Sequence, residues 1–109
     1  MARTSDAKMK KEATALLAMQ LKILMRAYDM ADSTNDSAIT LRLAELDEAL
    51  CDEVSQIGKL LALVYSTDEM LSIAECAAEA SGGSKSFMIN MIDKLWDGIV
   101  DKNGQLWAA

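Results

Sequence analysis

The chain has 109 residues, a net charge of −6 and no histidine or proline, and 51% of its residues are hydrophobic. That length favours one domain with a modest core, and this hydrophobic fraction argues against disorder over the whole chain. No apolar run reaches the roughly 18 residues of a membrane span, and no signal-peptide cleavage pattern is present. We therefore expect a single cytoplasmic domain over residues 1–109, without membrane contact and with loosely ordered ends at 1–4 and 105–109.

A first helix is expected to begin after a cap at Ser5 or Asp6 and to end at about Ala31, and from Ala13 onward it is apolar almost all round. Its polar positions form one narrow strip, and apolar residues cover the remainder. A helix in a small monomer needs an apolar stripe only about 100° wide, so this helix has more apolar surface than one core requires. A methionine-filled core is one explanation. The other, which we favour, is a homodimer interface formed by Leu17, Leu21, Leu24, Met25 and Tyr28.

The second helix should run from about Ala38 to Tyr65, after a break of six short polar residues at 32–37. The short break predicts an antiparallel hairpin of two long helices. Gly58 inside this helix indicates either a close helix crossing or a bend. One side of the helix is apolar, and another carries carboxylates at helical spacing. We interpret this acidic face as a partner-binding surface formed by Glu45, Asp47, Glu48, Asp52 and Glu53.

Two shorter helices should follow. Ser66 and Glu69 form a capping-box pattern that predicts a helix over residues 67–80. The Ser-Gly-Gly-Ser turn at 81–84 ends it, and a fourth helix is expected over about 85–100. A turn at 101–104 leads to a tail that Trp107 should anchor, because a large apolar ring is rarely left in water. The predicted fold is all-α: a small bundle built on a long antiparallel hairpin, with two shorter helices packed over it.

The residue types that most catalytic and metal sites need are missing. Without histidine, a hydrolase triad lacks its base and a di-metal carboxylate site lacks its Glu-x-x-His motif. Residues 99–104 resemble a calcium loop in outline, but Ile99 replaces the first acid. Cys51 and Cys76 are not in CxxC spacing and have apolar neighbours, so we expect two small buried side chains. We therefore expect no enzyme activity, no cofactor and no metal.

Residues 72–97 resemble a helix-turn-helix DNA-binding unit in outline. Ala78 and Gly82 match its small residue and its turn glycine, and Met88 and Met91 match later core positions. The second helix of the pair carries few cations, although affinity for DNA depends heavily on neutralised phosphates. A small DNA-binding regulator with a degenerate motif is therefore the alternative function, and nucleic acid is not the favoured partner.

Charge is distributed unevenly along the chain. Residues 1–28 have a net charge of +4, whereas residues 29–109 have −10. Such a field repels nucleic acid and attracts basic partners, although excess acid also simply keeps proteins dispersed. The favoured prediction is a non-catalytic homodimeric protein that binds and blocks a basic surface of a partner protein. Immunity proteins and phage-encoded inhibitors of host defence act in this way, which is an analogy of mode alone, since no motif identifies either.

Overall fold

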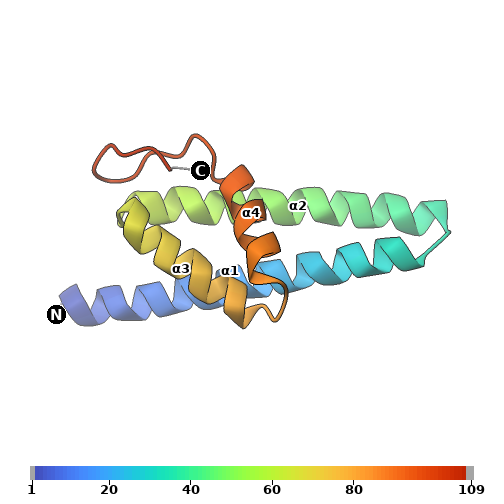
Figure 1. Ribbon diagram of the computed structural model, residues 1–109, viewed down its shortest axis with the longest axis horizontal. Helices are drawn as coiled ribbons and strands as arrows, with labels where there is room; N and C mark the ends of the chain where they lie inside the picture. The colour runs from blue at the N-terminus through green and yellow to red at the C-terminus, as the bar shows by residue number, and fades with distance from the viewer. Residues whose placement is uncertain (1, 108–109) are drawn as a thin grey trace.

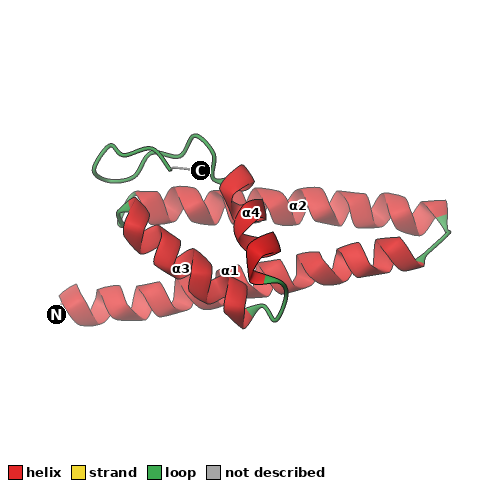
Figure 2. Cartoon of the chain, viewed as in Figure 1, coloured by secondary structure: helices red, strands yellow, loops and turns green. Residues whose placement is uncertain are grey.

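The computed structural model describes the backbone of residues 2–107 and the side chains of residues 7–107. The described chain forms four helices, α1 (Ala2–Ser33), α2 (Ser37–Ala62), α3 (Thr67–Ala80) and α4 (Lys85–Leu95). Helices α1 and α2 lie side by side as a long antiparallel hairpin, and α3 and α4 cross one side of it (Figures 1 and 2). The molecule measures 51 × 26 × 21 Å. The predicted all-α bundle on a long hairpin is confirmed.

The hairpin turn is fixed by a cap that the polar sequence provides. The Asp36 carboxylate accepts hydrogen bonds from the backbone N–H groups of Ala38 at 2.9 Å and Ile39 at 3.3 Å. These two donors lie in the first turn of α2 and have no partner within the helix, so the cap satisfies them. The N-terminal boundary of α2 follows directly from this interaction.

Helix α1 is longer than predicted. It begins at Ala2, so the expected cap at Ser5 or Asp6 is not its start, and it ends at Ser33 instead of Ala31. Residues 2–4, expected to be loosely ordered, continue the helix, and Met1 lies outside the described residues. Lysine, methionine and alanine are good helix formers, and they dominate the segment that follows.

Helix α3 has the predicted bounds, because its capping box is present. The Ser66 hydroxyl accepts a hydrogen bond from the backbone N–H of Glu69, and the Glu69 carboxylate accepts one from that of Ser66, each at 3.3 Å. The hydrogen bond from the Ser66 backbone lowers the pKa of Glu69. The buried side of α3 consists of small and medium side chains, which lets the helix pack closely on α1. These buried residues of α3 are Met70, Ile73, Ala74, Ala77 and Ala78.

Trp96 lies at the centre of the core and ends α4. Its side chain is fully buried, and its indole N–H donates a 2.8 Å hydrogen bond to the backbone carbonyl of Val54 in α2. A side chain on Gly58 would overlap the indole ring, so of the two alternatives that the sequence left open, this glycine marks the close helix crossing. Helix α4 ends at Leu95, five residues before the predicted end, and Gly98 follows with a φ of +86°.

The C-terminal segment is held in place through Trp107. Asp101 is buried, and its carboxylate accepts hydrogen bonds from the backbone N–H groups of Thr67 at 2.7 Å and of Asn103 and Gln105 at 2.8 Å. Trp107 is buried edge-on against Trp96, with 4.9 Å between ring centroids. The predicted anchor is therefore present, and residues 105–107 are not the loose tail we expected; residues 108–109 lie outside the described residues.

Candidate interaction surfaces

Three of the five predicted acidic residues share one exposed edge of α2. Glu45, Glu48 and Asp52 are exposed and border the same shallow depression, which Leu95 of α4 also lines. We call these three residues the acidic edge. Within the described part of the chain, its one ion pair joins Glu45 to Arg42, with 3.8 Å between the charged groups. Both side chains of this pair are largely exposed, and such pairs contribute at most about 1 kcal/mol, so the edge remains negative toward solvent.

The other two predicted acids lie elsewhere. Asp47 is half-buried, and its Oδ1 atom is buried without a hydrogen-bond partner in the described part of the chain. Burial, followed by the neighbouring Asp47 carboxylate, raises the pKa of Tyr28 to about 12. Glu53 is exposed, but it lies midway between the exposed residues Leu46 and Leu60, seven positions from each. This spacing places Glu53 in the same exposed row of α2 as Leu46 and Leu60, rather than on the acidic edge.

An aromatic hollow adjoins the acidic edge. It is lined by residues of α1, α2 and α4, and it shares Cys51 and Leu95 with the acidic depression. Tyr28 and Phe87 meet edge to face there, with ring centroids 6.2 Å apart. The volume of the hollow is about 440 Å³. The sequence did not predict this hollow, because it forms only when α4 crosses the hairpin. The lining residues are Tyr28, Cys51, Phe87, Asn90, Met91, Lys94 and Leu95.

The residues predicted for a dimer interface lie mainly inside the subunit. Leu17, Leu21 and Leu24 each have 0% exposed surface, and Met25 and Tyr28 are half-buried. The three leucines face the other helices of the same chain, so they are not free to contact a second copy. The excess apolar surface of α1 is real but lies on another side of the helix, where the exposed hydrophobic residues are Met9, Leu16, Met19, Ile23 and Met30.

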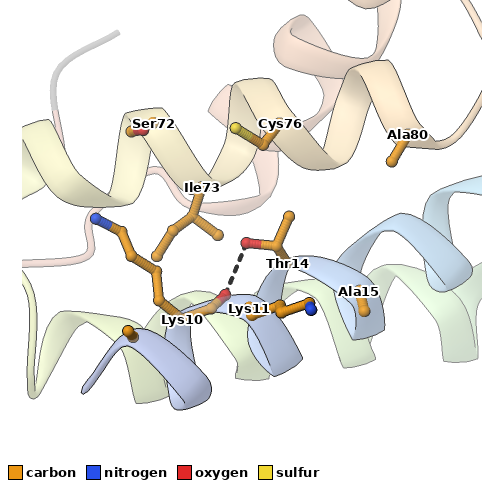
Figure 3. A pocket seen from close by; sticks show the side chains of 9 residues that line it. Lys10, Lys11, Thr14, Ala15, Ser72, Ile73, Cys76 and Ala80 are labelled. Carbon is orange, nitrogen blue, oxygen red and sulfur yellow. Dashed lines mark hydrogen bonds between the residues drawn. The ribbon is translucent and has the colours of Figure 1, made fainter. Parts of the chain in front are cut away.

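A groove between α1 and α3 combines lysines with small side chains (Figure 3). Lys10 and Lys11 of α1 border it, and the Lys10 ammonium lies 5.8 Å from the ring centroid of Tyr65. Cys76 lines the α3 side and is exposed, whereas Cys51 is half-buried. The prediction of two buried cysteines is thus wrong for Cys76 and only partly right for Cys51. The alanine-rich neighbours of Cys76 occupy the packed side of α3, and Cys76 falls on the other side.

The helix-turn-helix outline persists, but its leading cation is engaged within the chain. Residues 67–95 form two helices joined by a turn, and Gly82 has the positive φ of +80° that its turn position requires. The Lys85 ammonium lies 3.2 Å from the Glu79 carboxylate and 3.7 Å from that of Glu75. Two carboxylates of α3 thus surround the first cation of the expected recognition helix.

Two further features, a metal site and a membrane-spanning helix, are absent from the described residues. No group of three or more cysteine or acidic side chains between residues 7 and 107 is arranged to hold a metal ion. None of the described helices is both long and apolar enough to cross a bilayer. No protein family, no curated protein and no solved structure matches this chain. The arrangement defines a four-helix all-α protein whose notable features are surfaces: the acidic edge, the aromatic hollow and an exposed apolar side of the hairpin.

Proposed function

We propose that this protein is a non-catalytic interaction protein, whose acidic edge binds and blocks a basic surface of a partner protein. The observation that supports it is the gathering of Glu45, Glu48 and Asp52 on one edge, where the described chain forms only one exposed ion pair. Like charges at steps of three and four along a helix repel one another by a few tenths of a kcal/mol per pair. A partner with clustered lysine or arginine side chains would relieve that repulsion and associate faster.

The aromatic hollow gives this contact a second component. Charged side chains at the margin of an interface mainly govern association rate, whereas large side chains in pockets supply most of the affinity. Because the hollow adjoins the acidic edge, one partner segment can reach both. An arginine suits this arrangement, since its guanidinium stacks on aromatic rings and also pairs with carboxylates. We therefore propose that an arginine-bearing segment of the partner enters beside Tyr28 and Phe87. The carboxylates of the acidic edge would offset the repulsion from Lys94, which also lines the hollow.

Self-association is the second part of the proposal. The protein acts as a homodimer, as the apolar surface of α1 suggests, but through residues other than the buried leucines. The mode of action would be that of immunity proteins and phage-encoded inhibitors. DNA binding stays the alternative prediction and gains no support from Lys85, which is paired within the chain. Retention on heparin at moderate salt would favour the DNA-binding alternative, whereas retention on an anion exchanger alone would favour the acidic contact.

A capture experiment with three immobilised baits tests the acidic edge. The baits are the wild-type protein, an edge variant (Glu45→Gln, Glu48→Gln, Asp52→Asn) and a charge-matched control. The control neutralises three exposed acids at other places, Asp32→Asn, Asp68→Asn and Asp97→Asn. We expect a basic protein to bind the wild type and the control but not the edge variant. Because both variants have the same net charge, a difference between them reports the position of the neutralised acids. Equal capture by both variants would contradict the proposal.

A further inference from the structure

The exposed side of α1 carries a regular row of residues. Seven exposed positions follow one another at alternating steps of three and four. This spacing places them in one stripe along the helix, at the repeat that coiled-coil seams use. At 1.5 Å per residue, the stripe is about 31 Å long. We call it the exposed α1 row: Met9, Glu12, Leu16, Met19, Ile23, Arg26 and Met30.

The row reads almost the same in both directions. Met19 is its centre, and Glu12 and Arg26 lie seven positions before and after it. Leu16 and Ile23 lie three and four positions from the centre, and Met9 and Met30 form the two ends. Reversal of the row therefore places apolar residues opposite apolar residues. It also places the one acid opposite the one base.

Both charges of the row are free to pair with a second molecule. Glu12 and Arg26 are exposed, and neither forms an ion pair within the described part of the chain. Around them Leu16, Met19 and Met30 are each more than 45% exposed, as apolar side chains seldom are in a row. The apolar surface continues onto α2, because Met9 and Leu16 share a groove with Leu60 and Val64.

We infer that two copies of this protein pack their exposed α1 rows against each other, antiparallel, about a two-fold axis beside Met19. A two-fold contact uses the same patch on both subunits, so it requires a patch that is complementary to itself after reversal. The exposed α1 row meets that requirement. Glu12 of each copy pairs with Arg26 of the other, and Leu16 packs near Ile23 of the other. This inference rests on the proposed self-association and names its surface.

The charge pattern of the exposed α1 row favours a second copy of this chain over other binding partners. A basic partner would find an unpaired Arg26 in this row, and an acidic partner would find an unpaired Glu12. A second copy in the reversed direction leaves neither charge unpaired. The side of the hairpin that α3 and α4 cross is already covered within the subunit, so the two copies meet through the remaining side (Figure 1). The acidic edge of each copy lies outside the exposed α1 row and stays available to the partner protein.

Charge reversal with sedimentation velocity tests the inference. The variants are Glu12→Arg, Arg26→Glu and the double change, and circular dichroism checks their helical content. Each single reversal sets like charges against each other twice per dimer, and we expect the dissociation constant to rise roughly tenfold. The double reversal restores opposite charges at both pairs and should restore wild-type affinity. Glu12→Arg is the decisive variant, because it lowers the net negative charge and would strengthen any association limited by overall repulsion.

Disulfide trapping gives an independent readout. In a Cys51→Ala, Cys76→Ala background, Met19→Cys should form a covalent dimer under mild oxidation, because the axis brings both copies of this position together. Lys102→Cys, exposed and far along the chain, should not. A dimer that forms normally in all charge variants and resists trapping at residue 19 overturns this surface while leaving a dimer in place. A wild-type protein that is monomeric at about 50 μM overturns both, since stable dimers dissociate far below that concentration. Neither result bears on the acidic edge.

Discussion

Replacing Gly58 by alanine should destabilise the protein, although alanine is the better helix former. Gly58 lies inside α2, where it faces Trp96 of α4. A β-carbon at this position would lie only 2.7 Å from Cε2 of the indole and closer still to two neighbouring ring atoms. Distances of that size do not occur between real side chains, so the indole must move. Trp96 is fully buried, and its surroundings leave it little room to do so.

The opposing contributions can be compared in size. Alanine gains up to about 1 kcal/mol over glycine in a helix interior. Displacing Trp96 breaks its 2.8 Å hydrogen bond to the Val54 carbonyl. A buried polar group left without its partner costs about 1–3 kcal/mol, and overpacking a core costs about 1–3 kcal/mol more. We therefore expect Gly58→Ala to lower the free energy of unfolding by about 1–5 kcal/mol, which corresponds to roughly 5–20 °C in Tm.

Thermal and urea unfolding, followed by circular dichroism, measure the effect. Ala49→Gly is the matched control, because Ala49 is exposed on the same helix. It should cost only the propensity difference, up to about 1 kcal/mol. In a Trp96→Leu background, Gly58→Ala should lower the free energy of unfolding by less than it does in the wild type, since the smaller leucine side chain leaves room for the methyl group. A Tm for Gly58→Ala that equals or exceeds that of the wild type would refute the reasoning.

Three further predictions concern caps and cysteines. Ser66→Ala should lower the free energy of unfolding by about 1 kcal/mol through loss of the α3 cap, measured by urea unfolding. Burial raises the pKa of the Asp101 carboxyl, but hydrogen bonds from backbone N–H groups outweigh this effect and hold the pKa below its ordinary value of 3.8. Its stabilising contribution is therefore complete above that pH and is lost as pH falls through the lowered pKa, so acid should release the C-terminal segment, seen as a change in tryptophan fluorescence that Asp101→Ala produces at neutral pH. Cys76 should react with a thiol reagent before Cys51, and alanine at either position should preserve the fold.

Local signals in the sequence predicted the fold well. The polar break before α2 and the capping box at Ser66 each state where a helix begins, because both satisfy backbone N–H groups with nearby side chains. The apolar repeat of the second helix predicted most of the buried side of α2, but Leu46 and Val64, which belong to the same repeat, are exposed. The end of α4 was predicted too late, because the apolar spacing continues to Ile99 while the chain already turns at Trp96 to bring Trp107 onto the core.

The surfaces could be predicted only in part. Glu45, Glu48 and Asp52 share an edge because helical spacing alone puts them there. Asp47 does not, since Tyr28 of α1 packs beside it, and helical spacing contains no information about a neighbouring helix. For the same reason the amount of apolar surface on α1 was visible in the sequence, but its division into a buried and an exposed side was not. The aromatic hollow required the crossing of α4 over the hairpin.

The most direct test of the central claim is the association rate of this protein with the partner that it captures. The rate should be measured by stopped flow at rising salt for the wild type, the edge variant and the charge-matched control. We expect the wild-type and control rates to be similar and to fall steeply with salt, and the edge variant to associate at least roughly tenfold more slowly at low salt. An edge variant that associates at the wild-type rate would show that Glu45, Glu48 and Asp52 form a solvated surface and that the partner binds elsewhere.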